Sequence, residues 1–247
     1  MSVLTACYNG RKFLKKCADS IANQSDQDWE WIFVDDCSTD ESVRIARSYR
    51  RSGLNVKIIR NKKRLGCSSS YRKALEAATG ELCGILDADD AIKRNAVRRI
   101  KKAYDKNASV DFIYTRHHWC NDALMPKGKG LSSKPHEGKS LVDMSLDHRK
   151  HCYSHWRTFR TYLRDKADIF PEGLECAVDK NMGFLLEQTG PGGFLPEFWY
   201  LYRFHRENMS RKQGGRSRRT WRRLAKQYRI DRKRKKLQVY PIIEIAV

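Results

Sequence analysis

The regular alternation of short apolar runs with amphipathic segments most constrains how this chain can fold. Runs with the length and the β-branched or aromatic content of strands lie at residues 2–7, 29–34, 56–59, 82–86 and 111–116. Between them, apolar side chains recur at helical spacing over residues 11–23, 42–49, 69–78 and 95–104. This alternation predicts an α/β fold, in which a mainly parallel sheet carries helices on both faces.

Polar clusters follow three of the predicted strands. They are the pair Tyr8 and Asn9, the pair Asp35 and Asp36, and residues 87–90. Each cluster alone has a structural explanation, because Asn-Gly forms turns and Asp, Ser and Thr cap helices. Ligands of parallel sheets bind beyond the carboxyl ends of the strands, however, and all three clusters would lie at that edge. Their coincidence favours a ligand site.

The acidic residues indicate what this site would bind. Asp87, Asp89 and Asp90 place three carboxylates within four residues, and like charges this close repel one another. A divalent cation relieves the repulsion, and hard oxygen ligands suit Mg²⁺ or Mn²⁺. The carboxylates of Asp35 and Asp36 could accept hydrogen bonds from a base or a ribose. The chain has neither a Walker-type phosphate loop nor a G-x-G-x-x-G segment, so the residues predict a metal-dependent site for a nucleotide diphosphate.

The charge of the chain is concentrated near its end. Residues 211–236 contain fourteen Lys or Arg and one acid, so they carry +13 of the net +21. This change in composition predicts a folded domain over residues 1–210 and a basic, helical tail over residues 211–247. Trp221, Leu224, Ala225 and Tyr228 form a narrow apolar stripe on that helix. The tail could bind an anionic membrane surface or a polyanionic acceptor, or it could simply pack on the domain.

Several classes of protein are disfavoured by composition. No run approaches the roughly 20 apolar residues that span a bilayer, and the first residues lack the features of a signal peptide. The eight cysteines occur singly, which is typical of reduced, buried thiols. We therefore expect a cytoplasmic protein, with peripheral attachment to the cytoplasmic membrane face as an option that the basic tail leaves open.

Four motifs in order make this sequence resemble the family 2 glycosyltransferases. They are SVLTACYNG at residues 2–10, VDDCSTD at 34–40, ATGE at 78–81 and LDADD at 86–90. Residues 170–190 and 203–210 are also similar to the transferase domains of bacterial chondroitin- and hyaluronan-type polymerases. The resemblance implies a GT-A fold, and inverting transfer of a sugar from a UDP-sugar to a glycan or other hydroxyl acceptor with Mn²⁺ or Mg²⁺ as cofactor. It also favours glucuronate or an N-acetylhexosamine as the sugar.

The resemblance also assigns roles to individual residues. Asp36 would bind the uracil, Tyr8 would pack against it, and Asp87 would hold the ribose or a metal-bound water. Further donor contacts would come from Thr5, Arg64 and Ala88. The metal would be held by Asp89 and by His205, for which the alternative is a lone histidine satisfied within the fold. Asp179 would be the catalytic base, and a position near the start of a predicted helix over residues 178–189 offers a purely structural alternative.

The acceptor side is the least specific part of the resemblance. It would contain His151, His155, Trp156, Arg157 and, more weakly, Glu175, although Trp156 could equally belong to the core. Residues 124–135 are rich in Lys, Gly and Ser and are expected to form a mobile loop nearby. The sequence departs from the family at residues 71–74, where YRKA replaces Arg-Asn-x-Gly, and at residue 178, where Val replaces Glu.

Two other functions remain open from sequence alone. The chain could be a GT-A fold without activity that serves as a binding module, which turnover of a donor sugar would exclude. Less favoured is a nucleic-acid-binding protein that uses the basic face, since no recognisable nucleic-acid motif occurs.

Overall fold

The computed structural model describes residues 1–146 and 152–247. Its strands are β1 (Ser2–Cys7), β2 (Glu30–Asp35), β3 (Val56–Arg60), β4 (Leu82–Ile85), β5 (Ala91–Ile92), β6 (Phe112–Cys120), β7 (Pro126–Lys129), β8 (Arg157–Arg160), β9 (Gly192–Arg203) and β10 (Ile242–Glu244). Its helices are α1 (Arg11–Ala22), α2 (Ser42–Arg51), α3 (Cys67–Glu76), α4 (Ala96–Lys106), α5 (Leu141–Leu146), α6 (Val178–Thr189), α7 (Met209–Lys212) and α8 (Gly214–Lys235), with a 3₁₀ turn η1 at Thr161–Asp165.

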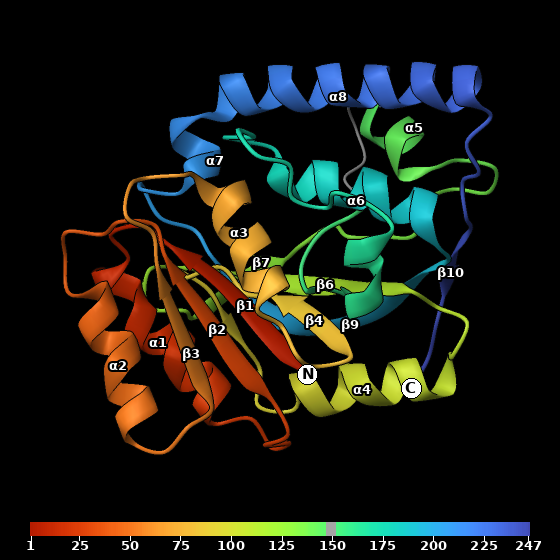
Figure 1. Cartoon of the computed structure of the whole chain (residues 1–247). Helices are drawn as coiled ribbons and strands as arrows, with labels where there is room; N and C mark the ends of the chain where they lie inside the picture. The colour runs from red at the N-terminus through yellow and green to blue at the C-terminus, as the bar shows by residue number, and fades with distance from the viewer. Residues whose placement is uncertain (147–151) are drawn as a thin grey trace.

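The first half of the chain builds the parallel part of one central sheet (Figure 1). β1 lies between β2 and β4, β3 lies outside β2, and all of these pairs are parallel. Val3 and Cys7 of β1 pack with α1, α2 and α4, while Leu4 packs on the other face with α3 and α6. Because both faces are covered, β1, β2 and β4 are mostly apolar, and the predicted α/β class is confirmed.

The second half of the sheet is mixed. β8 pairs antiparallel with both β4 and β6, and β9 then pairs parallel with β6. β7 also pairs antiparallel with β6, so the prediction of a mobile loop over residues 124–135 was wrong for its central part. Gly130, just after β7, donates its N–H to the carbonyl of His117 at 2.8 Å. The extended β6 therefore holds this segment against the sheet.

Trp156 belongs to the core, which overturns its predicted place on the acceptor side. Its side chain is fully buried, and its ring lies against β4 at Gly84. A Cβ atom at Gly84 would lie 2.7 Å from both the Trp156 ring and the Met1 side chain. A ring enclosed in this way cannot stack on a sugar.

Gly84→Ala is therefore expected to destabilise the fold by about 1–3 kcal/mol, because the added methyl group forces the indole ring to move within a packed core. Chemical denaturation would measure the loss. Gly128→Ala is the matched control, since a Cβ atom at this β7 position meets nothing within 4 Å. We expect it to change stability by no more than about 0.5 kcal/mol. Equal stability of the two variants would contradict the packing described for Trp156.

The region after residue 210 does not end as a free tail. α8 packs on α5 and α6, above the sheet in Figure 1, and the chain then returns along the side of the molecule. There β10 pairs in parallel with residues Gly192 to Phe194 of β9, and Ile245 is buried. The strand β10 was not predicted, and it joins the last residues to the same sheet. Within the described residues, no helix combines the length and the apolarity that crossing a membrane requires.

Candidate active site

The polar clusters of the sequence meet at one edge of the parallel sheet. Residues Cys7 of β1 and Asp35 of β2 are register partners at the ends of their strands, and β4 on the other side of β1 ends just before Asp87. Parallel strands present their carboxyl ends together, so residues far apart in sequence come close here. This edge is the candidate active site.

Asp36 organises the loop that leads into α3. Its carboxylate accepts hydrogen bonds from the Asn61 amide and from the backbone N–H groups of Leu65 and Gly66, at 2.8–2.9 Å. Gly66 has φ = +88°, a left-handed conformation that favours glycine. Asp36 therefore holds the loop before α3 in place. We call this loop the rim of the site.

Tyr8 and Arg64 face each other across this rim. The Arg64 guanidinium lies 3.7 Å from the centroid of the Tyr8 ring, and Tyr8 is 43% exposed. Because the Tyr8 ring is exposed and stacks on a planar cation, a nucleotide base could stack on the same surface. Thr5, by contrast, is fully buried, and its hydroxyl accepts a hydrogen bond from the Trp31 indole at 3.0 Å. The predicted donor contact of Thr5 is not supported by this geometry.

Asp87 is the centre of a hydrogen-bonded cluster. Its carboxylate accepts from the Tyr71 hydroxyl at 2.6 Å and from Arg157 Nη2 at 3.1 Å, and His155 Nε2 lies 3.5 Å away. Burial alone would raise the pKa of Asp87, but the contact with His155 and the charge of Arg157 hold it well below its usual range. Asp87 is therefore a fixed negative charge beside Ala88, which is half-buried in the same loop.

Asp89 and His205 lie side by side although 116 residues separate them. His205 Nε2 is 2.8 Å from Asp89 Oδ2, and the Asn208 amide donates to the same oxygen at 3.3 Å. The His205 ring is buried against Phe13 of α1, with ring centroids 4.2 Å apart. The structure thus brings together the two residues that were predicted to bind a metal.

Asp90 connects the loop of residues 87–90 to β9. Its carboxylate accepts from the Tyr200 hydroxyl at 2.8 Å and from the backbone N–H of Arg203 at 2.7 Å. Complete burial, together with the charges of Asp89 and Asp87, raises the pKa of Asp90 far above the usual range. Asp90 therefore joins β4 to β9.

Two sets of side chains could hold a divalent cation. One ligand atom each from Asp87, Asp90 and His155 lie within 4.8 Å of one another. Tyr71, Tyr200 and Arg157 already donate to these carboxylates, however, and the positive Arg157 opposes a second cation there. The pair Asp89 and His205 combines a carboxylate oxygen with an imidazole nitrogen, a donor set that suits Mn²⁺, and fits a metal better.

Asp179 lies in the first turn of α6, near the cluster around Asp87. The predicted helix over residues 178–189 is confirmed, and Ala177 before it has φ = +58°, which turns the chain sharply into the helix. Arg157 connects the two carboxylates, because its Nη1 is 3.8 Å from Asp179 Oδ2 while its Nη2 contacts Asp87. Burial raises the pKa of Asp179, but the charges of Lys180 and Arg157 lower it overall. Asp179 is thus an ionised, partly exposed carboxylate.

The remaining acceptor-side predictions have different outcomes. His155 lies in the site, stacked on Tyr200 at 4.6 Å between centroids. Glu175 is exposed on the loop before α6, where it pairs with Arg216 of α8. His151 lies outside the described residues.

Sequence reasoning missed an aromatic group that extends outward from His155. The rings of Tyr202, Trp119 and Phe204 follow one another with centroids 5.4–5.9 Å apart, and Trp119 and Phe204 are exposed. The signal was present as a series of aromatic residues at every second position, from Tyr200 to Phe204.

Comparison with known proteins identifies the family of this chain. The model of glycosyl transferase family 2 matches residues 2–166. The chain belongs to this family. A chondroitin synthase of Escherichia coli is 26% identical over 213 residues, which cover 86% of this chain but 30% of the synthase. The chain therefore spans less than a third of that relative, and the resemblance to transferase domains of chondroitin-type polymerases is confirmed at the level of sequence.

Solved structures of glycosyltransferases with the GT-A fold superpose on this chain. TarS of Staphylococcus aureus, residues 1–349 in complex with UDP-GlcNAc, superposes with a TM-score of 0.70 at 23% identity, over 84% of this chain and 59% of the other. A mannosyltransferase from Pyrobaculum calidifontis in complex with GDP-Man and Mn²⁺ gives a TM-score of 0.65 at 18% identity, over 97% of this chain and 65% of the other. The predicted GT-A fold is therefore confirmed.

Proposed function

We propose that this chain is an inverting, metal-dependent glycosyltransferase that moves a sugar from a UDP-sugar to a hydroxyl group of a glycan or glycoconjugate. The proposal rests on a single cluster of side chains that contains both the residues proposed for metal binding and the carboxylate proposed for proton transfer. Asp89 and His205 lie 2.8 Å apart at the sheet edge, and Arg157 connects Asp87 of the same loop to Asp179.

Asp179 is proposed as the general base. Inverting transfer is an in-line displacement at the anomeric carbon, in which the acceptor hydroxyl loses its proton as it attacks. A carboxylate that is 38% exposed and has a lowered pKa is ionised at neutral pH and open to an incoming hydroxyl group. Arg157 orients Asp179 and fixes its distance from Asp87. The proton passes to a carboxylate oxygen of Asp179, and the bond to the leaving UDP breaks on the opposite side of the sugar carbon.

Asp89 and His205 are proposed to hold Mn²⁺ or Mg²⁺, with Asn208 orienting the Asp89 carboxylate. When bound, the ion would neutralise charge on the diphosphate of the departing UDP. The mannosyltransferase that shares this fold was solved with Mn²⁺, which supports the choice of cofactor.

The donor is proposed to bind along the rim. Tyr8 and Arg64 would stack on or enclose the uracil, Asp36 would bind it by hydrogen bonding, and Asp87 and Ala88 would lie next to the ribose. TarS in complex with UDP-GlcNAc supports a UDP-sugar. The similarity to a chondroitin synthase favours glucuronate or an N-acetylhexosamine as the sugar.

The acceptor is proposed to approach from the side of Asp179 and His155. Aromatic rings bind the apolar faces of sugars, so the exposed Trp119 and Phe204 take over the role that was predicted for Trp156.

An inactive GT-A fold that only binds its ligand is the second candidate. Turnover of a donor sugar distinguishes the two.

Binding of UDP with and without Mn²⁺ tests the proposal. At about 100 times its dissociation constant a ligand stabilises the native state by about 2.7 kcal/mol, which corresponds to a rise in thermal midpoint of roughly 5–10 °C for a chain of this size. We expect such a rise with UDP and Mn²⁺ together and a much smaller one with UDP and a chelator. Equal UDP affinity under both conditions, measured by calorimetry, would count against the shared metal site. Screening UDP-sugars for Mn²⁺-dependent hydrolysis would then identify the donor.

A further inference from the structure

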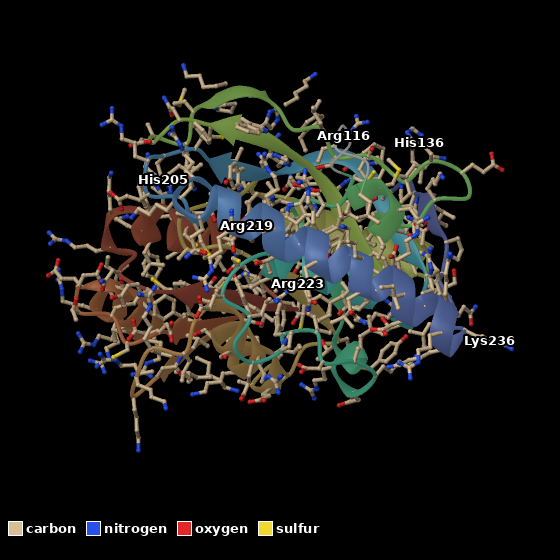
Figure 2. The ribbon with its side chains drawn as sticks, turned by 90° about the horizontal axis from the view of Figure 1, so that it is seen from above. Arg116, His136, His205, Arg219, Arg223 and Lys236 are labelled. Carbon is tan, nitrogen blue, oxygen red and sulfur yellow. The ribbon has the colours of Figure 1, made fainter. Side chains whose placement is uncertain are left out.

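The helix α8 presents a row of cations to solvent. Its 22 residues extend over about 33 Å, and Arg219, Arg223, Lys226 and Lys233 follow one another at spacings of four, three and seven residues, which place them on one face. Figure 2 looks down on this helix and shows Arg219 and Arg223 along it, His205 beyond its start and Lys236 at its end. All four side chains of the row are exposed. We call these four residues the cationic row.

The opposite face of α8 is fixed to the domain. Ala225 is fully buried, and Leu224 packs against the same cluster of side chains. The Tyr228 hydroxyl donates to Asn181 of α6 at 3.1 Å, and Arg232 donates to Ser140 before α5 at 3.0 Å. Leu224, Ala225 and Tyr228 of the predicted apolar stripe are therefore already used in packing on the domain, and the cationic row points outward.

Within residues 1–146 and 152–247, no acidic side chain forms an ion pair with a member of the cationic row. The ion pairs that α8 makes with described residues join Arg216 to Glu175, and Arg229 and Arg232 to Asp143. Arg219 and Arg223 lie four residues apart on α8, and like charges at this spacing repel. This arrangement costs helix stability when the protein is alone, and an anionic partner would remove the cost.

The start of α8 lies close to the candidate active site. Asn208, at the start of α7, donates to Asp89, and α7 leads within one residue into α8. On the other side, Glu175 lies four residues before Asp179 and pairs with Arg216 of the first turn. The Arg211 guanidinium of α7 lies 4.7 Å from the exposed Phe204 ring. A linear molecule that leaves the site can thus continue along α8.

We infer that α8 binds an anionic glycan, the acceptor of the proposed transferase, along the cationic row; this inference rests on the proposed function. A small anion requires donors that converge on one point. Here the charges lie in a line, over about 21 Å between Arg219 and Lys233, which fits a polymer with repeated carboxylate or phosphate groups. A membrane fits less well, because an interfacial helix buries an apolar face in the lipid, and Ile230 is the apolar member of the outward face.

The test compares two variants with the same change in net charge. The first carries Arg219→Glu, Arg223→Glu and Lys226→Glu. The control carries Arg98→Glu, Lys102→Glu and Lys106→Glu, three exposed cations at helical spacing on α4, which lies across the sheet from α8 in Figure 1. The three substituted side chains of α8 are exposed and make no ion pair with a described residue, so the first variant should fold. Thermal midpoints and UDP affinity in Mn²⁺ check the fold and the donor site of both.

The probes are labelled unsulfated chondroitin and poly(ribitol phosphate), with neutral dextran as the negative control. We expect the intact chain to bind at least one of the two polyanions, with an affinity that falls as salt rises. The α8 variant should bind it about tenfold less tightly or worse, a loss of about 1.4 kcal/mol, while the α4 variant should bind nearly as well as the intact chain. Which of the two polymers binds tells a carboxylate acceptor from a phosphate acceptor.

Three results would overturn the inference: wild-type glycan affinity in the α8 variant, an equal loss in both variants, or binding of the intact chain to neither polyanion. Duplex DNA and phosphatidylserine-containing vesicles are included as further probes. If α8 reversal abolishes binding to one of these and leaves glycan binding intact, the row serves nucleic acid or a membrane instead. A chain that binds glycan through α8 but neither binds UDP nor turns over a donor would refute the proposed transferase function alone.

Discussion

Asp179→Asn is expected to lower the rate of sugar transfer by about 10²–10⁴-fold, or about 3–5 kcal/mol of activation free energy, because asparagine has nearly the same size but cannot accept the proton. UDP affinity should stay within a few-fold, since the residues proposed for the nucleotide are unchanged. Single-turnover kinetics and calorimetry on the same variant measure the two quantities. If Asp179 only stabilises the start of α6, the variant should instead lose about 1 kcal/mol of stability or less with near-normal turnover.

Glu175→Gln is the matched control for this experiment. Glu175 lies four residues before Asp179 and is an exposed carboxylate that pairs with Arg216. With a short neutral acceptor, its loss should leave turnover close to that of the wild type. A large loss in Glu175→Gln together with a small one in Asp179→Asn would exchange the roles of the two residues.

Asp89→Ala is expected to abolish the dependence of UDP binding on Mn²⁺ and to lower transfer by at least about 10²-fold, because it removes one of two protein ligands proposed for the ion. Loss even of a residue that only orients a metal ligand commonly costs about 10–100-fold. The fold should survive, since Asp89 is partly exposed and Arg203 is bonded to its backbone carbonyl rather than to its side chain. Calorimetry with UDP in Mn²⁺ and in chelator measures the effect.

Asp105→Ala provides the control for this variant, because Asp105 is an exposed carboxylate on α4, at the side of the sheet away from α8. It should retain the full Mn²⁺ effect. Mn²⁺-dependent UDP binding of wild-type strength in Asp89→Ala would place the ion elsewhere, and the cluster of Asp87, Asp90 and His155 would be the next to examine.

The parallel half of the fold could be predicted from the sequence because its signals are local. Each strand from β1 to β4 is a short apolar run, and each intervening helix shows its own periodicity, so elements could be assigned without knowledge of their partners. The proximity of Asp36 and Asp87 followed from one further rule, that parallel strands end at the same edge.

The antiparallel part could not be predicted in this way. β8 contains Arg157 and Arg160 among its four residues and does not look like a central strand, yet it lies between β4 and β6. Its place depends on partners more than 40 residues away in the sequence. The error over Trp156 has the same origin, because its burial requires the missing side chain of Gly84, 72 positions earlier.

Tyr71 and Tyr200 were not predicted as site residues, because the role of each depends on a hydrogen bond to a carboxylate elsewhere in the chain. Tyr71 lies at a departure from the family pattern, and Tyr200 lies in a mostly aromatic run that gives no sign of its function. Only the folded chain shows that their hydroxyl groups meet the carboxylates of Asp87 and Asp90. Hydrogen-bond partners of this kind leave no periodic trace in a sequence.

The pairing of β10 with β9 has a consequence for the solubility of shortened forms of the chain. Cutting at residue 210, where the composition changes, would remove β10 as well as α8, and would leave the backbone N–H and C=O groups of Gly192 to Phe194 without their partners. An uncovered strand edge is a template on which other chains can add. A shortened chain would then self-associate through β9. Loss of activity in such a preparation would reflect aggregation, and would not by itself show that α8 takes part in the activity.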